Sequence, residues 1–148
     1  ASEFNVWADP ESARIVFDSE LPLEMVGWDV SVADAVISDE LAAEFSALSD
    51  LGNFAMSIQR QVREFCRDET KLDGFDLPDP ITMSVAIDSS MSSSEIRKHV
   101  RVHLGDGDAR GQTIIDHLDV LGKKPNCRVV LRVDRQRFVA MLRTAFLN

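Results

Sequence analysis

The chain has 148 residues, of which 45% are hydrophobic and 28% are charged. This is the size of one domain, and the composition is that of a chain with a buried core rather than of a disordered one. The formal net charge of −9 repels phosphate groups, so we expect neither nucleic acid nor a membrane surface as a partner. We find no apolar run of membrane-spanning length and no secretory signal pattern, and we therefore expect a cytoplasmic protein.

The two cysteines, Cys66 and Cys127, lie far apart in the sequence. Their separation matches neither a disulfide framework nor a zinc motif, so we expect two reduced, mostly buried thiols. The sequence begins at Ala1, without Met, and a helix signal follows within ten residues. Because domains usually begin with some unstructured residues, we expect this chain to be a segment of a longer protein.

The first predicted helix begins at Asp9-Pro10-Glu11. These residues supply an N-cap, a proline at the first helical position and an acid near the positive end of the helix dipole. We expect this helix to end near Ser19 or Glu20. The short apolar run over residues 23–30 then predicts a strand.

A long helical stretch is expected over residues 32–67, with Ser31 or Asp34 as its cap and a break at residues 49–53. Apolar residues recur at spacings of three and four in its second part, which predicts an amphipathic face. That face consists of Phe54, Ile58, Val62 and Phe65.

Residues 81–87 follow a proline and predict a buried helix, although periodicity alone leaves a strand open. Residues 88–94 are polar and predict a turn. Three strands and a final helix capped by Asp134 complete the chain. The strands are expected at residues 98–104, 112–115 and 127–133, and the helix is expected to direct Phe138, Met141 and Leu142 inward.

Interleaved strands and helices predict an α/β fold with a mixed sheet and flanking helices, formed by residues 1–148 as a single unit. The last strands are separated by turns rather than by helices, which favours antiparallel pairing at that end.

Asp79 lies between Pro78 and Pro80. Two prolines stiffen the backbone around its carboxylate, and hard cations bind best to oxygen ligands that are held in place. The simpler interpretation is that Asp79 caps a helix that begins at Pro80, and caps are commoner than ligands.

Glu3, Asn5 and Trp7 alternate along the chain. On an extended segment all three would point to one face. A carboxylate, an amide and an aromatic ring suit a sugar, because they combine hydrogen-bonding groups with a stacking surface. A terminal segment without function is the alternative.

Other polar residues are weaker candidates. The three histidines, His99, His103 and His117, form no metal-binding motif and are expected at the surface or at a sheet edge. Residues 89–94 contain serines without a paired base. The sequence of residues 105–108 lacks the spaced acids of an EF-hand and predicts a hairpin turn.

Several segments together resemble the inosine-uridine type nucleoside hydrolases. Residues 3–13 resemble the EFN-x-x-x-DPEAA segment of that family, and residues 23–31 resemble the strand that follows it. Residues 77–80 and 86–88 resemble the LHDP and AIDP elements, and residues 110–116 resemble the RGxTVVD strand. Residues 126–134 resemble the last strand before the C-terminal helix. The segments occur in the family order, so the resemblance extends from Glu3 to about Phe146.

The resemblance implies the C-terminal half of a Rossmann-type nucleoside hydrolase fold. It implies that Glu3 and Asn5 bind the ribose near its 5′-hydroxyl, that Phe4 lines the same pocket, and that Asp79 is a calcium ligand that also touches a ribose hydroxyl. In the family, Ca²⁺ binds the ribose hydroxyls and the attacking water, and an N-terminal Asp accepts a proton from that water.

Two departures from the family pattern limit what this chain contributes. The Asp-rich DTDPGxDDA element, which supplies the general base and most calcium ligands, does not occur in the sequence. A single Asp cannot form a site of six to eight oxygens. The family His that protonates the departing base is replaced by Pro78. No residue of this half is therefore assigned as catalytic with certainty, and the base-side candidates are Trp7, Trp28, Gln59 and Arg63.

The leading hypothesis is N-glycosidic hydrolysis of ribonucleosides in nucleoside salvage by the full-length protein, with Ca²⁺ as the cofactor. The alternative is a non-catalytic or degenerate family member that binds nucleosides or sugars. The partners expected are a ribonucleoside substrate, the N-terminal half of the same protein, and further copies in a homodimer or homotetramer. Without the other half, we expect a sheet edge and apolar surface to be exposed.

Overall fold

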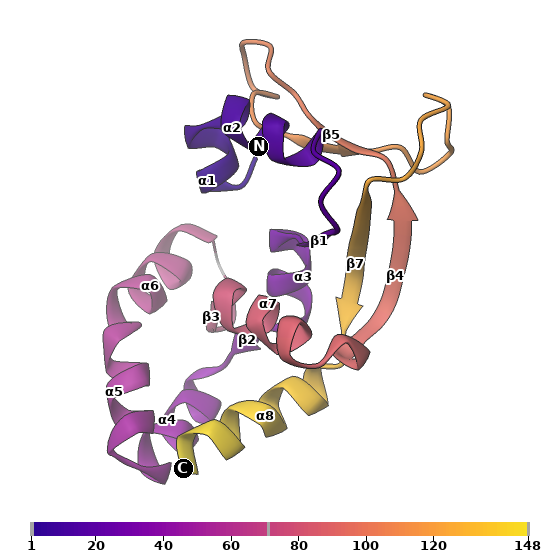
Figure 1. The fold of residues 1–148 in the computed structure, drawn as a ribbon. Coiled ribbons are helices and arrows are strands. Elements are labelled where there is room, and N and C mark those ends of the chain that lie inside the picture. The colour runs from indigo at the N-terminus through magenta and orange to yellow at the C-terminus, as the bar shows by residue number, and fades with distance from the viewer. Residues whose placement is uncertain (1, 71, 148) are drawn as a thin grey trace. The chain divides into compact units, whose positions relative to one another are not determined.

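The computed structural model describes residues 2–70 and 72–147 and has an α/β architecture (Figure 1). Contacts divide the chain into two compact units. The first unit comprises Ala1–Trp28 and Ser94–Leu131, and the second comprises Asp29–Ser93 and Arg132–Asn148. Each unit is described by itself below.

Two short helices, α1 (Phe4–Ala8) and α2 (Pro10–Phe17), open the first unit. The predicted start of α2 is confirmed, because Asp9 is its N-cap and accepts a hydrogen bond from the Ser12 amide at 3.0 Å. The predicted extended segment over Glu3, Asn5 and Trp7 is wrong. The chain is helical there, so the period-two argument that placed the three side chains on one face does not apply.

The main sheet has three strands. Its central strand is β7 (Cys127–Val133), with β1 (Leu23–Val26) on one side and β4 (Ser92–Lys98) on the other. β1 runs parallel to β7, in the register Leu23 opposite Cys127, whereas β4 runs in the opposite direction (Figure 1). The sheet is therefore mixed, and the predicted fold class is confirmed.

Several strand boundaries differ from those predicted. β1 ends at Val26, and the helix α3 (Trp28–Asp34) takes the rest of the expected strand. The expected polar turn at residues 88–94 contains a short 3₁₀ helix, η2 (Ser89–Met91), and the start of β4.

A two-stranded antiparallel sheet pairs β5 (Val100–Val102) with β6 (Thr113–Ile115), as expected for strands joined by a turn. Helix α2 packs against β5, and side-chain hydrogen bonds connect the two elements. The Asn126 amide donates to the carbonyl oxygens of Phe17 at 2.6 Å and Val100 at 2.9 Å, and its oxygen accepts from the Val100 amide at 2.7 Å. One side chain therefore joins the end of α2 to the start of β5.

The second unit is mainly helical. It contains β2 (Val36–Ile37), α4 (Asp39–Leu48), α5 (Asp50–Ile58), α6 (Arg60–Phe65), a π-helical turn η1 (Cys66–Thr70), β3 (Phe75–Asp76), α7 (Pro78–Ile87) and α8 (Arg135–Leu147). β2 and β3 pair antiparallel. The expected break at residues 49–53 is confirmed in part, since α4 ends at Leu48 and Ser49 caps α5.

The core of the second unit lies between α4, α5, α7 and α8. Phe45 and Phe146 meet edge to face at 5.2 Å between ring centroids. A Cβ at Gly52 would lie 2.2 Å from the Phe45 carbonyl oxygen, so only glycine permits this approach of α5 to α4. Helix α7 buries Ile81 and Val85, which confirms the predicted buried helix.

Asp34 was one of two residues predicted to cap the next helix, but it does not cap the helix that follows it. It is the last residue of α3, it is 2% exposed, and the N-cap of α4 is Ser38. Its carboxylate accepts from the Arg132 guanidinium at 2.7–3.1 Å and from the Val133 amide at 2.8 Å. Burial alone would raise the pKa of Asp34, but these donors outweigh it and lower that pKa.

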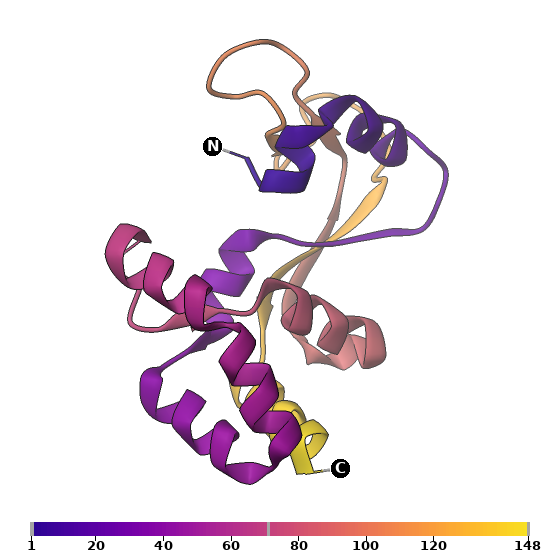
Figure 2. The same ribbon diagram turned by 90° about the vertical axis from the view of Figure 1, so that its left-hand side faces the viewer.

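The predicted amphipathic face of the second helical stretch exists but is not buried. Helices α5 and α6 follow one another (Figure 2), and all four apolar residues of the face are exposed. These are Phe54, Ile58, Val62 and Phe65, between 42% and 61% exposed.

Two smaller expectations concern the cysteines and the membrane. Both thiols are free and buried as expected, and burial raises the pKa of Cys127. Among the described residues, none of the helices combines the length and the apolarity that crossing a bilayer requires.

Candidate functional site

Helix α1 presents a carboxylate and an amide side by side. Glu3 is its N-cap, and one carboxylate oxygen accepts from the Val6 amide at 3.0 Å. The other oxygen accepts from the Asn5 side-chain amide at 3.1 Å. Asn5 is exposed, its side-chain oxygen is an acceptor, and Glu3 keeps acceptor capacity beyond these two bonds. The pair can accept hydrogen bonds from hydroxyl groups.

Two aromatic rings flank this pair on the same helix. Phe4 and Trp7 are 71% and 56% exposed, and their ring centroids lie 6.4 Å apart at a tilt of 34°. Exposed aromatic faces next to hydrogen-bonding groups are typical of surfaces that bind sugars or bases. The four residues named for this segment from the sequence therefore lie on one short helix, although the segment is not extended.

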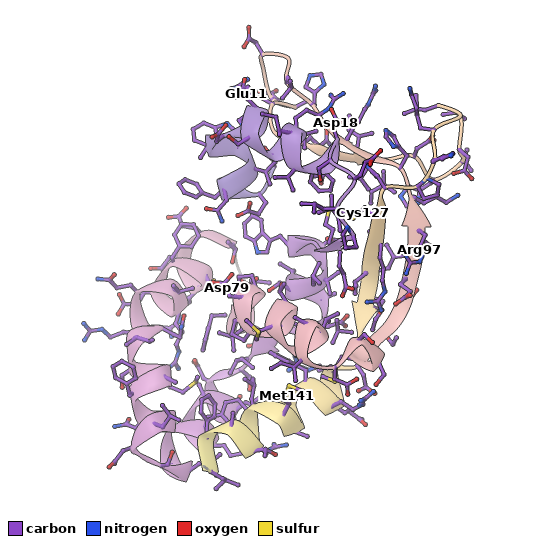
Figure 3. All side chains as sticks on the ribbon, viewed as in Figure 1. Glu11, Asp18, Asp79, Arg97, Cys127 and Met141 are labelled. Atoms are coloured by element: carbon purple, nitrogen blue, oxygen red, sulfur yellow. The ribbon has the colours of Figure 1, made fainter. Side chains whose placement is uncertain are left out.

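Asp79 lies in the first turn of α7 (Figure 3). Leu77 is the N-cap of that helix, and no side chain caps it, so the interpretation of Asp79 as a cap is wrong. The helix begins at Pro78, because proline is tolerated in a first turn whose N–H groups have no intrahelical acceptor. Asp79 is exposed, and its side chain has no hydrogen-bond or ion-pair partner among the described residues. Its carboxylate is free to bind a ligand at the positive end of the helix dipole.

The described residues do not form a metal site. No three His, Cys, Asp or Glu side chains cluster within residues 2–70 and 72–147 in a way that could hold an ion. A hard cation takes six or more oxygens, and Asp79 offers at most two. Asp79 therefore fits a single ligand of a site completed by other groups, and the chain does not fit a complete metal centre.

The base-side candidates have different surroundings. Trp28, at the start of α3, is half exposed. Gln59 joins α5 to α6 and is half buried. Arg63 pairs with Asp39, and its guanidinium lies 5.6 Å from the centroid of the Phe75 ring. These contacts already engage the charge of Arg63.

The predicted site residues are divided between the two units. Glu3, Phe4, Asn5, Trp7 and Trp28 belong to the first unit, and Asp79, Gln59 and Arg63 belong to the second. Arg110 and Gly111 contact the segment that carries α1, although no function was predicted for them from the sequence. The sequence feature that could have drawn attention to them is the arginine-glycine pair within the RGxTVVD-like segment.

Comparison with known proteins identifies the family. The sequence model of the inosine-uridine preferring nucleoside hydrolases matches residues 1–140. Pyrimidine-specific ribonucleoside hydrolase RihA of Escherichia coli (strain K12) is 34% identical over 147 residues, and RihA of Salmonella paratyphi B is 32% identical over 147 residues. Each alignment covers 96% of this chain and 46% of the relative, so the chain spans about half the length of these proteins.

Solved structures agree with this result. A plant nucleoside hydrolase, the PpNRh1 enzyme, has a TM-score of 0.88 at 25% identity, covering 99% of this chain and 48% of that one. A purine-preferring ribonucleoside hydrolase from Gardnerella vaginalis has a TM-score of 0.82 at 25% identity, covering 99% of this chain and 46% of that one. The chain belongs to the inosine-uridine preferring nucleoside hydrolase family.

Proposed function

We propose that the full-length protein containing this chain hydrolyses the N-glycosidic bond of ribonucleosides and releases base and ribose. The family match over residues 1–140 carries this proposal. The names of the relatives support it, because RihA is described as a pyrimidine-specific ribonucleoside hydrolase. The chain contributes substrate-binding residues and one metal ligand. The N-terminal half of the same protein supplies the general base and the remaining ligands.

Glu3 and Asn5 bind the ribose near its 5′-hydroxyl in this proposal. The hydrogen bond between them supports the assignment, since it orients the amide and leaves acceptor oxygens for a hydroxyl group. Phe4 lines the pocket beside them. The N-cap bond from Val6 to Glu3 fixes the carboxylate before substrate arrives, which reduces the entropy lost on binding.

Asp79 is proposed as one ligand of the cofactor Ca²⁺ and as a contact to a ribose hydroxyl. Its exposed carboxylate, with no partner among the described residues, supports this role. A Ca²⁺ ion held by Asp79 and by ligands of the N-terminal half would supply positive charge for binding hydroxyl oxygens and for activating water. The carboxylate oxygens of this chain stabilise positive charge that develops on the ribose as the glycosidic bond breaks.

The departing base must be activated without the family histidine, because Pro78 has no proton to donate. Trp7 and Trp28 are proposed to contact the base through their exposed rings, and Gln59 through its amide. Arg63 stays a weaker candidate, since Asp39 and Phe75 engage its guanidinium and arginine is a poor proton donor at neutral pH.

The remaining proposals concern the biological role, the location and the oligomeric state of the protein. We propose a role in nucleoside salvage in the cytoplasm and assembly into a homodimer or homotetramer. A second function is favoured by one observation: Pro78 stands where the family has its proton donor. The protein would then bind nucleosides without hydrolysing them.

Substitution of Asn5 tests the proposed function. In the full-length protein, Asn5→Ala should reduce kcat/KM for ribonucleosides about fivefold to thirtyfold, because a hydrogen bond to substrate contributes about 1 to 2 kcal/mol. It should have little effect on 5′-deoxyribonucleosides, which lack the hydroxyl that Asn5 binds. Asn53→Ala, which changes an exposed asparagine on α5, is the matched control. An equal loss on both substrates refutes the ribose contact, and nucleoside binding without base release in the wild type establishes the second function.

A further inference from the structure

The turn at Arg110 and Gly111 closely contacts the segment that carries α1. Gly111 has a φ of +78°. A Cβ placed on it would lie 2.8 Å from the Trp7 Cα, 3.0 Å from the Trp7 nitrogen and 3.0 Å from the Ser2 hydroxyl oxygen. Two of these atoms belong to the backbone of α1, which cannot move away as a flexible side chain can. Only glycine meets both the backbone conformation and the close approach.

Polar contacts hold the same segment on both sides of Glu3 and Asn5. The Ser2 hydroxyl donates to the Arg110 carbonyl at 2.6 Å. The Arg110 guanidinium binds both carboxylate oxygens of Glu11, at 2.9 and 3.0 Å. This guanidinium lowers the pKa of Glu11. Both bonds come from one guanidinium nitrogen, Nη2, while the Nη1 atom is used elsewhere. The Arg110 side chain therefore holds Glu11 by a charge-assisted contact.

The turn is itself fixed to the hairpin that β5 and β6 form. The Gly111 amide donates to the His103 carbonyl at 2.9 Å, and the His103 amide donates to the Gln112 carbonyl at 2.9 Å. The Arg110 guanidinium also donates to the Leu104 carbonyl at 3.1 Å. Ser2, Trp7 and Glu11 therefore contact a turn that hydrogen bonds hold against the β5–β6 hairpin.

We propose that Arg110 and Gly111 are positioning residues for ribose recognition, which set the place of α1 and thereby of Glu3 and Asn5. The inference rests on the proposed function of those two residues. Gly111 sets how closely α1 approaches the hairpin, and Arg110 fixes the flanks of α1 through Ser2 and Glu11. A displacement of about 1 Å at a substrate-binding group can reduce a rate up to roughly a hundredfold, which gives remote positioning residues a measurable effect.

Gly111→Ala in the full-length protein tests the close approach. Two other glycines provide matched controls, because Gly107 and Gly122 have φ values of +95° and +59° with no atom within 4 Å of an added Cβ. Gly107→Ala and Gly122→Ala therefore introduce a comparable backbone strain without the contact to α1. We expect Gly111→Ala to reduce kcat/KM for a ribonucleoside about tenfold to a hundredfold and both controls to stay within about twofold.

The measurement that separates positioning from general damage is discrimination between a ribonucleoside and its 5′-deoxy analogue. Gly111→Ala should remove most of this discrimination, and in an Asn5→Ala background it should change the discrimination no further. Hydrogen exchange of the α1 amides should rise in Gly111→Ala and stay at the wild-type rate in the two controls.

Milder variants keep the test decisive if Gly111→Ala does not fold. Glu11→Gln removes the charge that Arg110 binds at an exposed site. Arg110→Lys keeps the charge but has one nitrogen in place of the two that reach Glu11 and the Leu104 carbonyl. We expect Glu11→Gln to reduce discrimination and Arg110→Lys to retain part of it. If these variants lower kcat/KM for both substrates by the same factor, or if Gly111→Ala behaves like its controls, the positioning inference is wrong. If Asn5→Ala leaves discrimination unchanged, the proposed ribose contact itself fails.

Discussion

At the scale of single residues, Asp79 is the clearest case of a side chain whose surroundings point to a ligand. The prolines on either side were visible in the sequence, but they do not distinguish a cap from a ligand. The structure excludes the cap, because the helix begins at Pro78, two residues before the expected start at Pro80, and Leu77 is its N-cap. An exposed carboxylate without a partner among the described residues contributes little to stability, which agrees with the proposal that Asp79 is a ligand.

Asp79→Ala in the full-length protein should abolish calcium-supported turnover and reduce calcium content, while the free energy of unfolding without calcium changes by less than about 0.5 kcal/mol. Metal analysis, base release and denaturant unfolding check these three values. Asp50→Ala is the matched control, because Asp50 is also an exposed acid in a first helical turn. Unchanged kcat in Asp79→Ala would contradict the metal assignment.

At the scale of elements, the junction of α3, β7 and α8 depends on Asp34. Its folded-state pKa is lower than the value of 3.8 for a free Asp, since Arg132 and the Val133 amide stabilise the charged form more than burial disfavours it. A lowered pKa gives stability that is complete above pH 3.8 and is lost as the pH falls through the folded pKa. The stabilisation is therefore a neutral-pH effect that acid removes.

Asp34→Asn should lower the free energy of unfolding at pH 7 by about 2 kcal/mol, which is typical for losing hydrogen bonds to a buried charge. The difference from wild type should shrink as the pH falls from 3.8 through the lower folded-state pKa, because the carboxylate takes up its proton first in the unfolded state and then in the folded state. Denaturant unfolding of both proteins across this pH range measures the difference in the free energy of unfolding. Asp18→Asn, which removes only an exposed pair with Arg14, is the control. A difference that stays constant with pH would refute the account.

The elements also show which local signals suffice for prediction. The start of α2, the buried helix α7, and strand β7 followed by helix α8 were predicted because caps, prolines and apolar runs are encoded locally. Helix α1 was missed, since it spans five residues and its cap is Glu3, which is not among the favoured N-cap residues. The two-residue strands β2 and β3 depend on each other and carry no local pattern.

The residues of the candidate site also differ in whether the sequence alone could predict them. Glu3, Phe4, Asn5 and Asp79 were predicted as site residues through motif resemblance, and they remain proposals. The sequence did not identify the contact of Gly111 with Trp7, because residues about a hundred positions apart come together only in the fold. Close approach is a tertiary property, and an arginine-glycine pair in a sequence does not specify its partner.

At the scale of the whole molecule, the main feature that needs an explanation is the exposed apolar face on α5 and α6. A face with Phe54 and Phe65 more than half exposed is unusual for a surface in contact with water alone. This agrees with the expectation that the chain leaves apolar surface exposed for other groups to cover. The proposed N-terminal half, or further copies of the protein, would cover it.

Base release by the full-length protein tests the central claim most directly. Ribonucleosides are incubated with wild-type protein as purified, after removal of metal by a chelator, and after addition of calcium, and free base and ribose are both quantified. The account predicts equal amounts of base and ribose, loss of activity on chelation and recovery with calcium. Nucleoside binding without release of base, or release that chelation does not affect, would contradict it.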